Sequence, residues 1–322
     1  MTASRFPEVV PKLSHDVLEA IGNTPLVDLE GFYVKLEYLN PSGSIKARIA
    51  RYMIEKAEAE GSLSPGDTIV EATSGNTGNA LSMVAAIKGY RMIVVMPTGL
   101  SGERVAISRA LGAEVLEVGH FHVDEALTTA KRLGEKPGYF CPAQFESEHN
   151  VEENRTWLGP EILGGLPEGV APDALVMGVG TGGTLVGVGQ AFREVNPEVK
   201  LFAMEPDESC TLLCGEIGQH LVEGISDGFV PGIYQRHQDL IDGVLPVSSE
   251  EAVAEMRRLA REYGLFVGPS SGANLAAARR VRAAHPGLEN IVTLFCDEGE
   301  KYISEHFARG YSNGQEAAGA AL

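Results

Sequence analysis

Apolar residues follow two patterns along the chain. Short apolar runs of strand length are each followed by a longer segment in which apolar residues recur at helical spacing. The predicted strands cover residues 32–37, 68–71, 91–96, 114–118, 174–179, 200–204 and 291–295, and the predicted helices cover 45–59, 79–88, 103–111, 124–133, 154–163 and 250–263, with two more that end near 194 and follow 272. This alternation predicts an α/β protein built on parallel sheets with helices on both faces.

A polar interruption falls at residues 144–150, which read QFESEHN. With 322 residues the chain is long enough for two lobes, and we expect it to cross from one lobe to the other here. No internal repeat is found along the chain.

The charge balance narrows the range of partners. Asp and Glu total 44 against 26 Lys and Arg, a formal net charge of -18, so phosphate-rich partners would be repelled. We therefore expect no nucleic acid and no anionic membrane as a partner. Neither a signal peptide nor a stretch of transmembrane length is found, which favours a cytoplasmic location.

The four cysteines do not predict a disulfide framework, because they are too few for a chain of this length. Cys210 and Cys214 are separated by four positions, a spacing that could hold a metal ion on a helix. No histidine or second cysteine pair stands at ligand spacing beside them, so we predict no metal site.

One lysine occupies an unusual position. Lys46 follows the turn Asn40-Pro41-Ser42-Gly43 and opens a predicted helix. The positive end of a helix disfavours an ammonium group, and a lysine held there suits Schiff-base chemistry on an aldehyde cofactor. A solvated surface lysine is the alternative on this stretch alone.

Two further loops connect a predicted strand to a helix. Thr73-Ser74-Gly75-Asn76-Thr77-Gly78 offers backbone N–H groups, hydroxyls and an amide at a helix start, where a carboxylate or phosphate would bind, although simple helix capping explains it too. Gly178-Val179-Gly180-Thr181-Gly182-Gly183-Thr184 has small residues that let main-chain N–H groups close around a phosphate.

The second loop also satisfies the Gly-x-Gly-x-x-Gly pattern of dinucleotide sites. Glu205 follows at about the distance expected of a residue that binds a ribose. An NAD-dependent dehydrogenase is therefore a competing hypothesis. It leaves Lys46 and the 73–78 loop without a role.

Taken together, these motifs resemble the cysteine synthase (O-acetylserine sulfhydrylase) family of pyridoxal-phosphate enzymes, which share the fold of the tryptophan synthase β-subunit. The resemblance runs from about Ile21 to Ser304. The motifs, in family order, are Gly22-Asn23-Thr24-Pro25-Leu26, Asn40-Pro41-Ser42 before Lys46, the 73–78 loop, Gly180-Thr181-Gly182-Gly183-Thr184 and Gly268-Pro269-Ser270-Ser271-Gly272.

The resemblance implies a role for each matching residue. Lys46 would form the Schiff base with pyridoxal 5'-phosphate and later move protons. Asn76 would contact the ring hydroxyl, and Ser270 would hydrogen-bond the pyridine nitrogen. The phosphate would be held by Gly180, Thr181, Gly182, Gly183 and Thr184, and the substrate carboxylate by Thr73, Ser74, Thr77 and Gln144.

The resemblance also implies fold type II architecture. We expect a larger cofactor-binding domain of residues 1–41 and 151–310, a smaller mobile domain of residues 42–150, a frayed tail at 311–322 and a homodimer. The implied reaction is β-replacement on a β-substituted L-alanine through an α-aminoacrylate, with O-acetyl-L-serine as donor and sulfide or a small thiol as nucleophile. The stretch 146–157 departs from the family pattern beside the substrate, which leaves the substrate open.

Two alternatives share the fold. A serine or threonine dehydratase would carry a Ser-x-Gly-Asn-His type of loop, where this chain has Asn76-Thr77. A binding or regulatory protein without catalysis would not need the lysine together with every cofactor loop. We therefore rank both alternatives below β-replacement.

Overall fold

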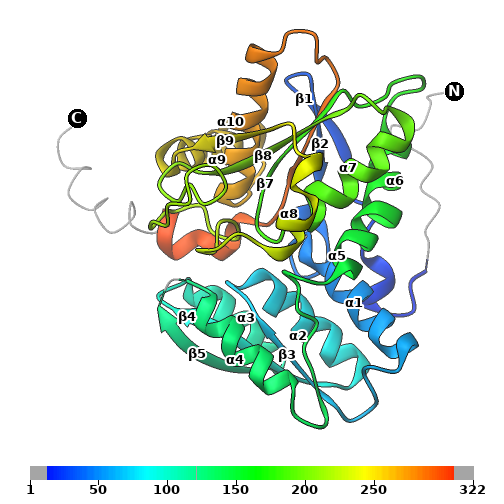
Figure 1. The fold of residues 1–322 in the computed structure, drawn as a ribbon, viewed down its shortest axis with the longest axis vertical. Coiled ribbons are helices and arrows are strands. Elements are labelled where there is room, and N and C mark those ends of the chain that lie inside the picture. The colour runs from blue at the N-terminus through cyan, green and yellow to red at the C-terminus, as the bar shows by residue number, and fades with distance from the viewer. Residues whose placement is uncertain (1–12, 121, 308–322) are drawn as a thin grey trace, which may run out of the picture.

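A computed structural model describes residues 13–120 and 122–307. Within these residues the strands form a six-stranded and a four-stranded sheet, each in its own lobe (Figure 1). The predicted tail at 311–322 and the first twelve residues of the expected larger domain lie outside the described residues.

The six-stranded sheet has the strand order β1-β2-β10-β7-β8-β9. Its strands are β1 (Leu26–Leu29), β2 (Phe32–Leu36), β7 (Ala174–Gly178), β8 (Lys200–Pro206), β9 (Gly243–Val247) and β10 (Ile291–Phe295). The β1–β2 hairpin is antiparallel, and every other pairing in this sheet is parallel.

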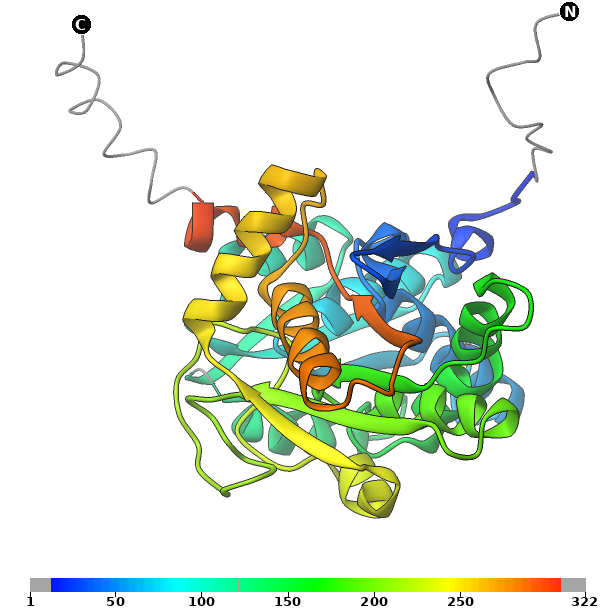
Figure 2. The same ribbon diagram turned by 90° about the horizontal axis from the view of Figure 1, so that it is seen from above.

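Helices cover both faces of this sheet. Successive strand residues point to opposite sides, and both sets of side chains are apolar, so each face packs against helices. In β7, Ala174 and Val176 join the cluster under α9 (Ser249–Tyr263) and α10 (Pro269–Ala284), whereas Leu175 and Met177 join the cluster under α6 (Gly159–Gly165) and α7 (Gly183–Val195). Figure 2 shows α9 and α10 together on their face of the sheet. The buried strands are accordingly apolar on both sides.

The four-stranded sheet has the order β5-β4-β3-β6 and is parallel throughout. Its strands are β3 (Thr68–Ala72), β4 (Arg91–Thr98), β5 (Glu114–His120) and β6 (Tyr139–Phe140). Val70 and Ala72 pack toward α4 (Asp124–Gly134), while Ile69 packs toward α1 (Lys46–Glu60) and α2 (Asn76–Lys88). Near β5 lies α3 (Gly102–Ala110).

The predicted α/β class and the two mostly parallel sheets are confirmed. Helix α5 (Glu148–Glu153) begins inside the polar interruption at residues 144–150, and the expected crossing between the lobes there stays a prediction. The predicted helix 154–163 is a π-helical turn, Asn154–Leu158, followed by α6. Sequence patterns did not find strands β1, β6 and β9 or helices α5 and α8 (Gly232–His237).

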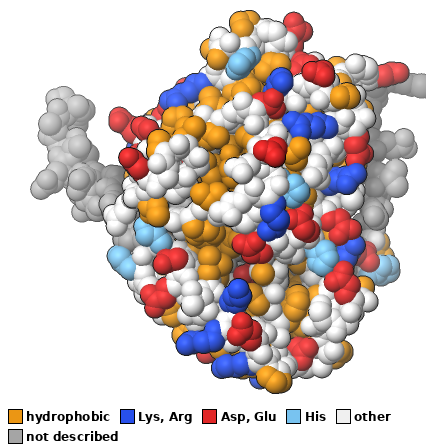
Figure 3. All heavy atoms as spheres, viewed as in Figure 1, with side chains coloured by type: hydrophobic (Ala, Val, Ile, Leu, Met, Phe, Trp, Pro, Cys, Tyr) orange, Lys and Arg blue, Asp and Glu red, His pale blue; other side chains and the backbone are white. Residues whose placement is uncertain are grey.

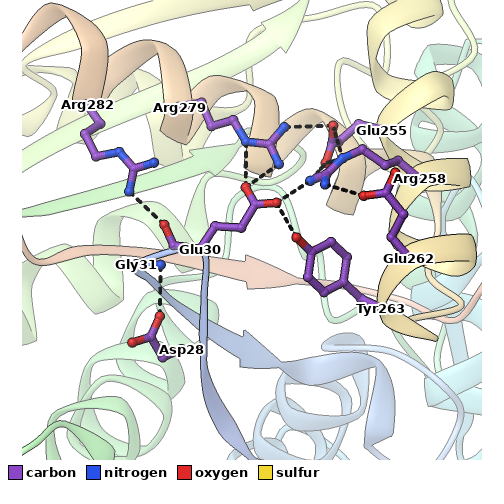
Figure 4. Close-up of polar contacts among 9 residues, drawn as sticks. All are labelled: Asp28, Glu30, Gly31, Glu255, Arg258, Glu262, Tyr263, Arg279 and Arg282. Carbon is purple, nitrogen blue, oxygen red and sulfur yellow. Dashed lines mark hydrogen bonds and ion pairs between the residues drawn. The ribbon is translucent and has the colours of Figure 1, made fainter.

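The turn between β1 and β2 is fixed to α9 and α10 by Glu30 (Figure 4). Its carboxylate accepts hydrogen bonds from Arg258 at 2.8 Å and from Arg279 at 2.6 Å. Burial acts to raise the pKa of Glu30, but hydrogen bonds from Tyr263 and the two arginines outweigh it and lower the pKa to about 2. The hairpin at the sheet edge is thus held by a network rather than by an isolated surface pair.

Candidate active site

A cleft brings together segments that are far apart in the sequence. It is lined by Lys46, Asn76, Ser270, four residues of the phosphate loop (Gly180, Thr181, Gly182 and Thr184) and residues that sequence patterns did not single out, among them Gly224, Asn274, Cys296 and Asp297. Both sheets contribute, because Asn76 begins α2 of the smaller lobe and Asp297 follows β10 of the larger one.

Lys46 is the first residue of α1, and its backbone N–H lies 3.3 Å from the Ser44 hydroxyl. The preceding turn has positive φ angles at Ser42 and Gly43, 72° and 64°. The Lys301 ammonium donates to the carbonyls of both residues, at 2.7 and 3.1 Å. This arrangement compensates a strained turn and fixes the position from which Lys46 reaches the cleft.

The Gly180 to Thr184 loop meets the N-terminus of α7, a site suited to phosphate. A Cβ on Gly180 would lie 2.6 Å from the Gly224 carbonyl oxygen, and Gly182 has φ +85°. A Cβ on Gly183 would collide with the Asn150 amide. Because side chains are excluded at these positions, the main chain can come close to a ligand, and the loop fits the phosphate of pyridoxal phosphate.

Asn76 has a defined orientation. Its Nδ2 donates to Asp297 Oδ2 at 2.6 Å, and its Oδ1 accepts from Lys301 Nζ at 3.0 Å. Tyr302 donates to the same Asp297 oxygen. An amide nitrogen carries two hydrogens, so Asn76 keeps one for a ligand oxygen, as the predicted contact with the cofactor's ring hydroxyl requires.

None of the four predicted carboxylate-binding residues lines the cleft itself. Thr77 donates to Gln144 Oε1 at 2.6 Å, Gln144 donates to the Ala72 carbonyl at 2.8 Å, and the Thr73 hydroxyl accepts from Gly75 N–H at 2.9 Å. These three side chains are buried and are not part of the cleft lining. Their hydrogen bonds stabilise the conformation of the 73–78 loop. Ser74 lines an adjoining cavity. Their contact with a substrate therefore stays a prediction.

The adjoining cavity shares Glu223, Gly224 and Ile225 with the cleft. Glu223 forms an ion pair with Arg104 of α3, whose guanidinium also donates to the Ser74 carbonyl at 3.2 Å. Burial acts to lower the pKa of Arg104, but the charges of Glu223, Tyr302 and Asp297 together outweigh it and raise the pKa above the usual value. Arg104 is therefore a permanent cation beside the 73–78 loop, and its charge is matched by Glu223.

Ser270 lies in the first turn of α10 and is 5% exposed within the cleft. Next to it, the Ser271 hydroxyl accepts from Cys296 N–H at 3.0 Å, which ties the start of α10 to the end of β10. Burial raises the pKa of Cys296 to about 12, so this thiol stays protonated at neutral pH.

The dinucleotide hypothesis fails at Glu205. Its carboxylate is 1% exposed and accepts from the backbone N–H groups of Leu212 and Leu213, at 2.7 and 3.0 Å. A carboxylate used in this way cannot bind a ribose. Among the described residues, no group of three or more His, Cys, Asp and Glu side chains is placed to hold a metal ion.

The geometry defines a class of enzyme with a phosphate cradle, a lysine at a helix start and polar side chains at the carboxyl ends of parallel strands. The model of the family described as pyridoxal-phosphate dependent enzyme matches residues 17–297. The chain belongs to this family, within which it groups with the cysteine synthases.

Individual relatives agree. A cysteine synthase of Staphylococcus aureus (strain N315) is 43% identical over 90% of this chain and 95% of the relative. An O-ureido-L-serine synthase of Streptomyces lavendulae is 40% identical over 95% of this chain and 96% of its own length. A crystal structure of O-ureido-L-serine synthase superposes with a TM-score of 0.88 at 39% identity, covering 95% of this chain and 99% of the other.

These comparisons confirm the predicted family, the fold type II architecture and the dependence on pyridoxal phosphate. They make the chain an enzyme and agree with β-replacement chemistry. Separately, no helix among the described residues is long and apolar enough to cross a membrane.

Proposed function

We propose that this enzyme exchanges the β-substituent of O-acetyl-L-serine for sulfide or a small thiol, giving L-cysteine or an analogue. The observation that carries the proposal is the convergence of Lys46, Asn76, Ser270 and the phosphate loop on one cleft. When bound, pyridoxal phosphate supplies an electron sink at the substrate's α-carbon.

Lys46 is proposed as the group that holds the cofactor and then moves the α-proton. It is anchored at the first turn of α1, and the cleft is enclosed by loops from both lobes. Because Lys46 lines the same cleft as the phosphate loop, we expect its amine to reach the α-carbon of a substrate bound there.

Ser270 is proposed as the partner of the pyridine nitrogen. A neutral hydroxyl there would leave that nitrogen unprotonated when the cofactor is bound, which would favour loss of the β-substituent over transamination. Ser74, at the start of the adjoining cavity, is proposed to bind the substrate carboxylate with support from Thr73, Thr77 and Gln144.

Residues 42–150 are proposed to form the mobile domain that closes over residues 1–41 and 151–310. All strands of the four-stranded sheet fall inside 42–150, and the described strands of the other sheet fall outside it. Two polar contacts, Asn76 with Asp297 and Arg104 with Glu223, link the two parts at the cleft. Such contacts would form and break as the domain moves.

A cytoplasmic homodimer completes the proposal. All four cysteines are free thiols, as expected in a reducing compartment. On the face shown in Figure 3, acidic and basic side chains are interspersed, with no single basic patch suited to nucleic acid or an anionic membrane. Light scattering of the purified enzyme tests the dimer.

The deciding experiment measures product formation from O-acetyl-L-serine with sulfide, with a small thiol and with hydroxyurea. The last is included because a relative carries the name O-ureido-L-serine synthase. L-cysteine formation at the highest kcat/KM with sulfide supports the proposal. Release of pyruvate without a β-replacement product would instead identify a β-eliminating enzyme.

A further inference from the structure

Two thiols meet in the loop that joins β8 to α8. Cys210 Sγ and Cys214 Sγ are 2.6 Å apart, and the turn between them is closed by a hydrogen bond from Cys214 N–H to the Cys210 carbonyl at 3.0 Å. Cys210 is buried and Cys214 is exposed. An oxidant can therefore reach one thiol of the pair directly from solvent.

The Glu205 carboxylate holds the turn between Cys210 and Cys214 in place. Its two oxygens accept from Leu212 and Leu213 N–H, and the Cys210 thiol lies 3.4 Å from Oε1. The backbone between the two cysteines is thus fixed at the N–H groups of Leu212 and Leu213. The two thiols therefore stay on the same side of the turn. The pair needs little rearrangement to reach bonding distance.

We propose that Cys210 and Cys214 are a modification site at which a peroxide forms a reversible intrachain disulfide. Cys214 Sγ attacks the peroxide, the O–O bond breaks, and a sulfenic acid and one water result. Cys210 Sγ then attacks the Cys214 sulfur, the S–O bond breaks and a second water leaves. The two sulfurs lose two electrons and two protons in all, and a dithiol reductant reverses the change.

The order of attack follows from burial. Desolvation is the largest cause that raises the pKa of Cys210 to about 12, and the neighbouring Glu205 carboxylate adds to it. The thiolate is the reacting form of cysteine, so the buried thiol is the poorer first nucleophile. Once Cys214 is oxidised, its sulfur lies in contact with Cys210, which favours the second step.

The pair is connected to the active-site cleft. Ser226 donates to the carbonyl of Ser209, the residue before Cys210, at 2.9 Å, and its own N–H donates to the Val179 carbonyl at 3.1 Å. Gly224, in the same segment, packs against Gly180 of the phosphate loop. A covalent bond at 210–214 therefore restrains the wall of the cleft, and we expect oxidation to lower turnover several-fold.

Mapping of thiols in the holoenzyme tests the site. After hydrogen peroxide treatment and alkylation, trypsin releases residues 201–236 as one peptide, which contains these two cysteines and no others. We expect this peptide to lose two hydrogens and to resist alkylation until dithiothreitol is added, while Cys141 and Cys296 remain alkylatable. Two alkylated thiols in this peptide after oxidation, or a bond to another chain, would overturn the proposal.

Turnover tests the connection to the cleft, with Cys214→Ser as the matched variant. Wild-type turnover should fall on oxidation and recover with dithiothreitol, whereas Cys214→Ser should keep its turnover through the same treatment. Equal losses in the two proteins, or a wild-type disulfide without any loss, would overturn the connection. The mapping does not depend on the proposed reaction, so failure of one is distinguishable from failure of the other.

Discussion

Asn76 and Asp297 form a hydrogen bond of 2.6 Å between the two lobes of the enzyme. Asn76 opens α2 beside the four-stranded sheet, and Asp297 follows β10 of the six-stranded sheet. With Lys301 on its other end, the Asn76 amide is fixed so that one N–H remains for the cofactor. The amide orientation therefore depends on residues more than two hundred positions away in the sequence.

Replacement of Asp297 by Asn should weaken cofactor binding. The change removes a charge-assisted acceptor, a contact worth about 1.5 to 3 kcal/mol, so the dissociation constant should rise roughly 10- to 100-fold. Titration of the apoenzyme with pyridoxal phosphate measures the effect. Tyr302→Phe, which removes a different donor to the same carboxylate and keeps the Asn76 contact, serves as the control. Unchanged binding in Asp297→Asn would show that Asn76 is oriented by other groups.

Lys46→Ala should abolish cofactor attachment and reduce turnover by at least about 10²- to 10⁴-fold, the usual contribution of a positioned acid–base group. Borohydride reduction followed by peptide mapping checks the attachment, which should be found on Lys46 in the wild type. The control is Lys56→Ala on the same helix, where the ammonium pairs with Glu152 at the surface. A cofactor still fixed by borohydride in Lys46→Ala would refute the assignment.

Gly183→Ala should disrupt the phosphate loop. The new methyl group would displace Asn150, whose Nδ2 donates to Thr181 Oγ1 at 3.0 Å. We expect at least a 10-fold loss of cofactor affinity, measured by the same titration. Gly164→Ala is the matched control, because the added Cβ meets no atom within 4 Å and alanine favours the helix. Equal affinity in the two variants would contradict the cradle.

Glu153 should make stability depend on pH in an unusual direction. Its side chain is fully buried, and both oxygens are without a hydrogen-bond partner among the described residues. Burial, opposed by Arg48, raises the pKa of Glu153 from 4.5 to about 8. Between these values the folded state holds a proton that the unfolded state has lost, so stability falls as pH rises from about 4.5 to 8.

Glu153→Gln removes this dependence. Near pH 5 the variant and the wild type should differ by no more than about 1 kcal/mol, and at pH 8 the variant should be more stable by roughly 3 to 5 kcal/mol. Urea unfolding at both pH values measures the difference, with exposed Glu168→Gln as the control. A gap between variant and wild type that does not widen with pH would be the contrary result.

The sequence predicts the parts of the site that depend on local residue types. Lys46 and the glycine loop each stand where a helix starts. A helix start preceded by small residues is a typical anion-binding arrangement, so the sequence alone indicates it. The α/β fold class can be predicted for the same reason, because apolar strands and periodic helices are patterns among neighbouring residues. The elements that were missed are short or atypical. Strand β6 has two residues, and edge strand β9 contains Pro246.

Residues whose role depends on a distant partner could not be found in this way. Arg104 looks like an ordinary helix residue until it pairs with Glu223, 119 positions away. Glu205 shows the opposite error, because its spacing suggested a ribose contact and its oxygens instead cap the 210–214 turn. Asp297 had one usable signal, its position directly beyond the last parallel strand.

The last prediction concerns the leaving group. Residues 212–231, which supply Glu223, Gly224 and Ile225 to the cleft, contain no Lys or Arg. Two candidate arginines already have partners, because Arg104 pairs with Glu223 and Arg236 pairs with Glu146 and Glu148. His220 accepts from Val222 N–H through Nδ1, so this nitrogen is not free to donate to a phosphate.

A phosphoserine would bring nearly two negative charges to this wall, and an unpaired charge in a partly desolvated site costs several kcal/mol. An acetyl ester brings none, so kcat/KM should be at least about 100-fold higher with O-acetyl-L-serine than with O-phospho-L-serine. Glu223→Gln leaves Arg104 without its counter-charge, and should narrow this ratio by raising the rate with the phosphate ester. Steady-state product formation with each donor measures this ratio in the wild type and in Glu223→Gln. A wild type that prefers O-phospho-L-serine would mean that a cation outside this wall binds the leaving group.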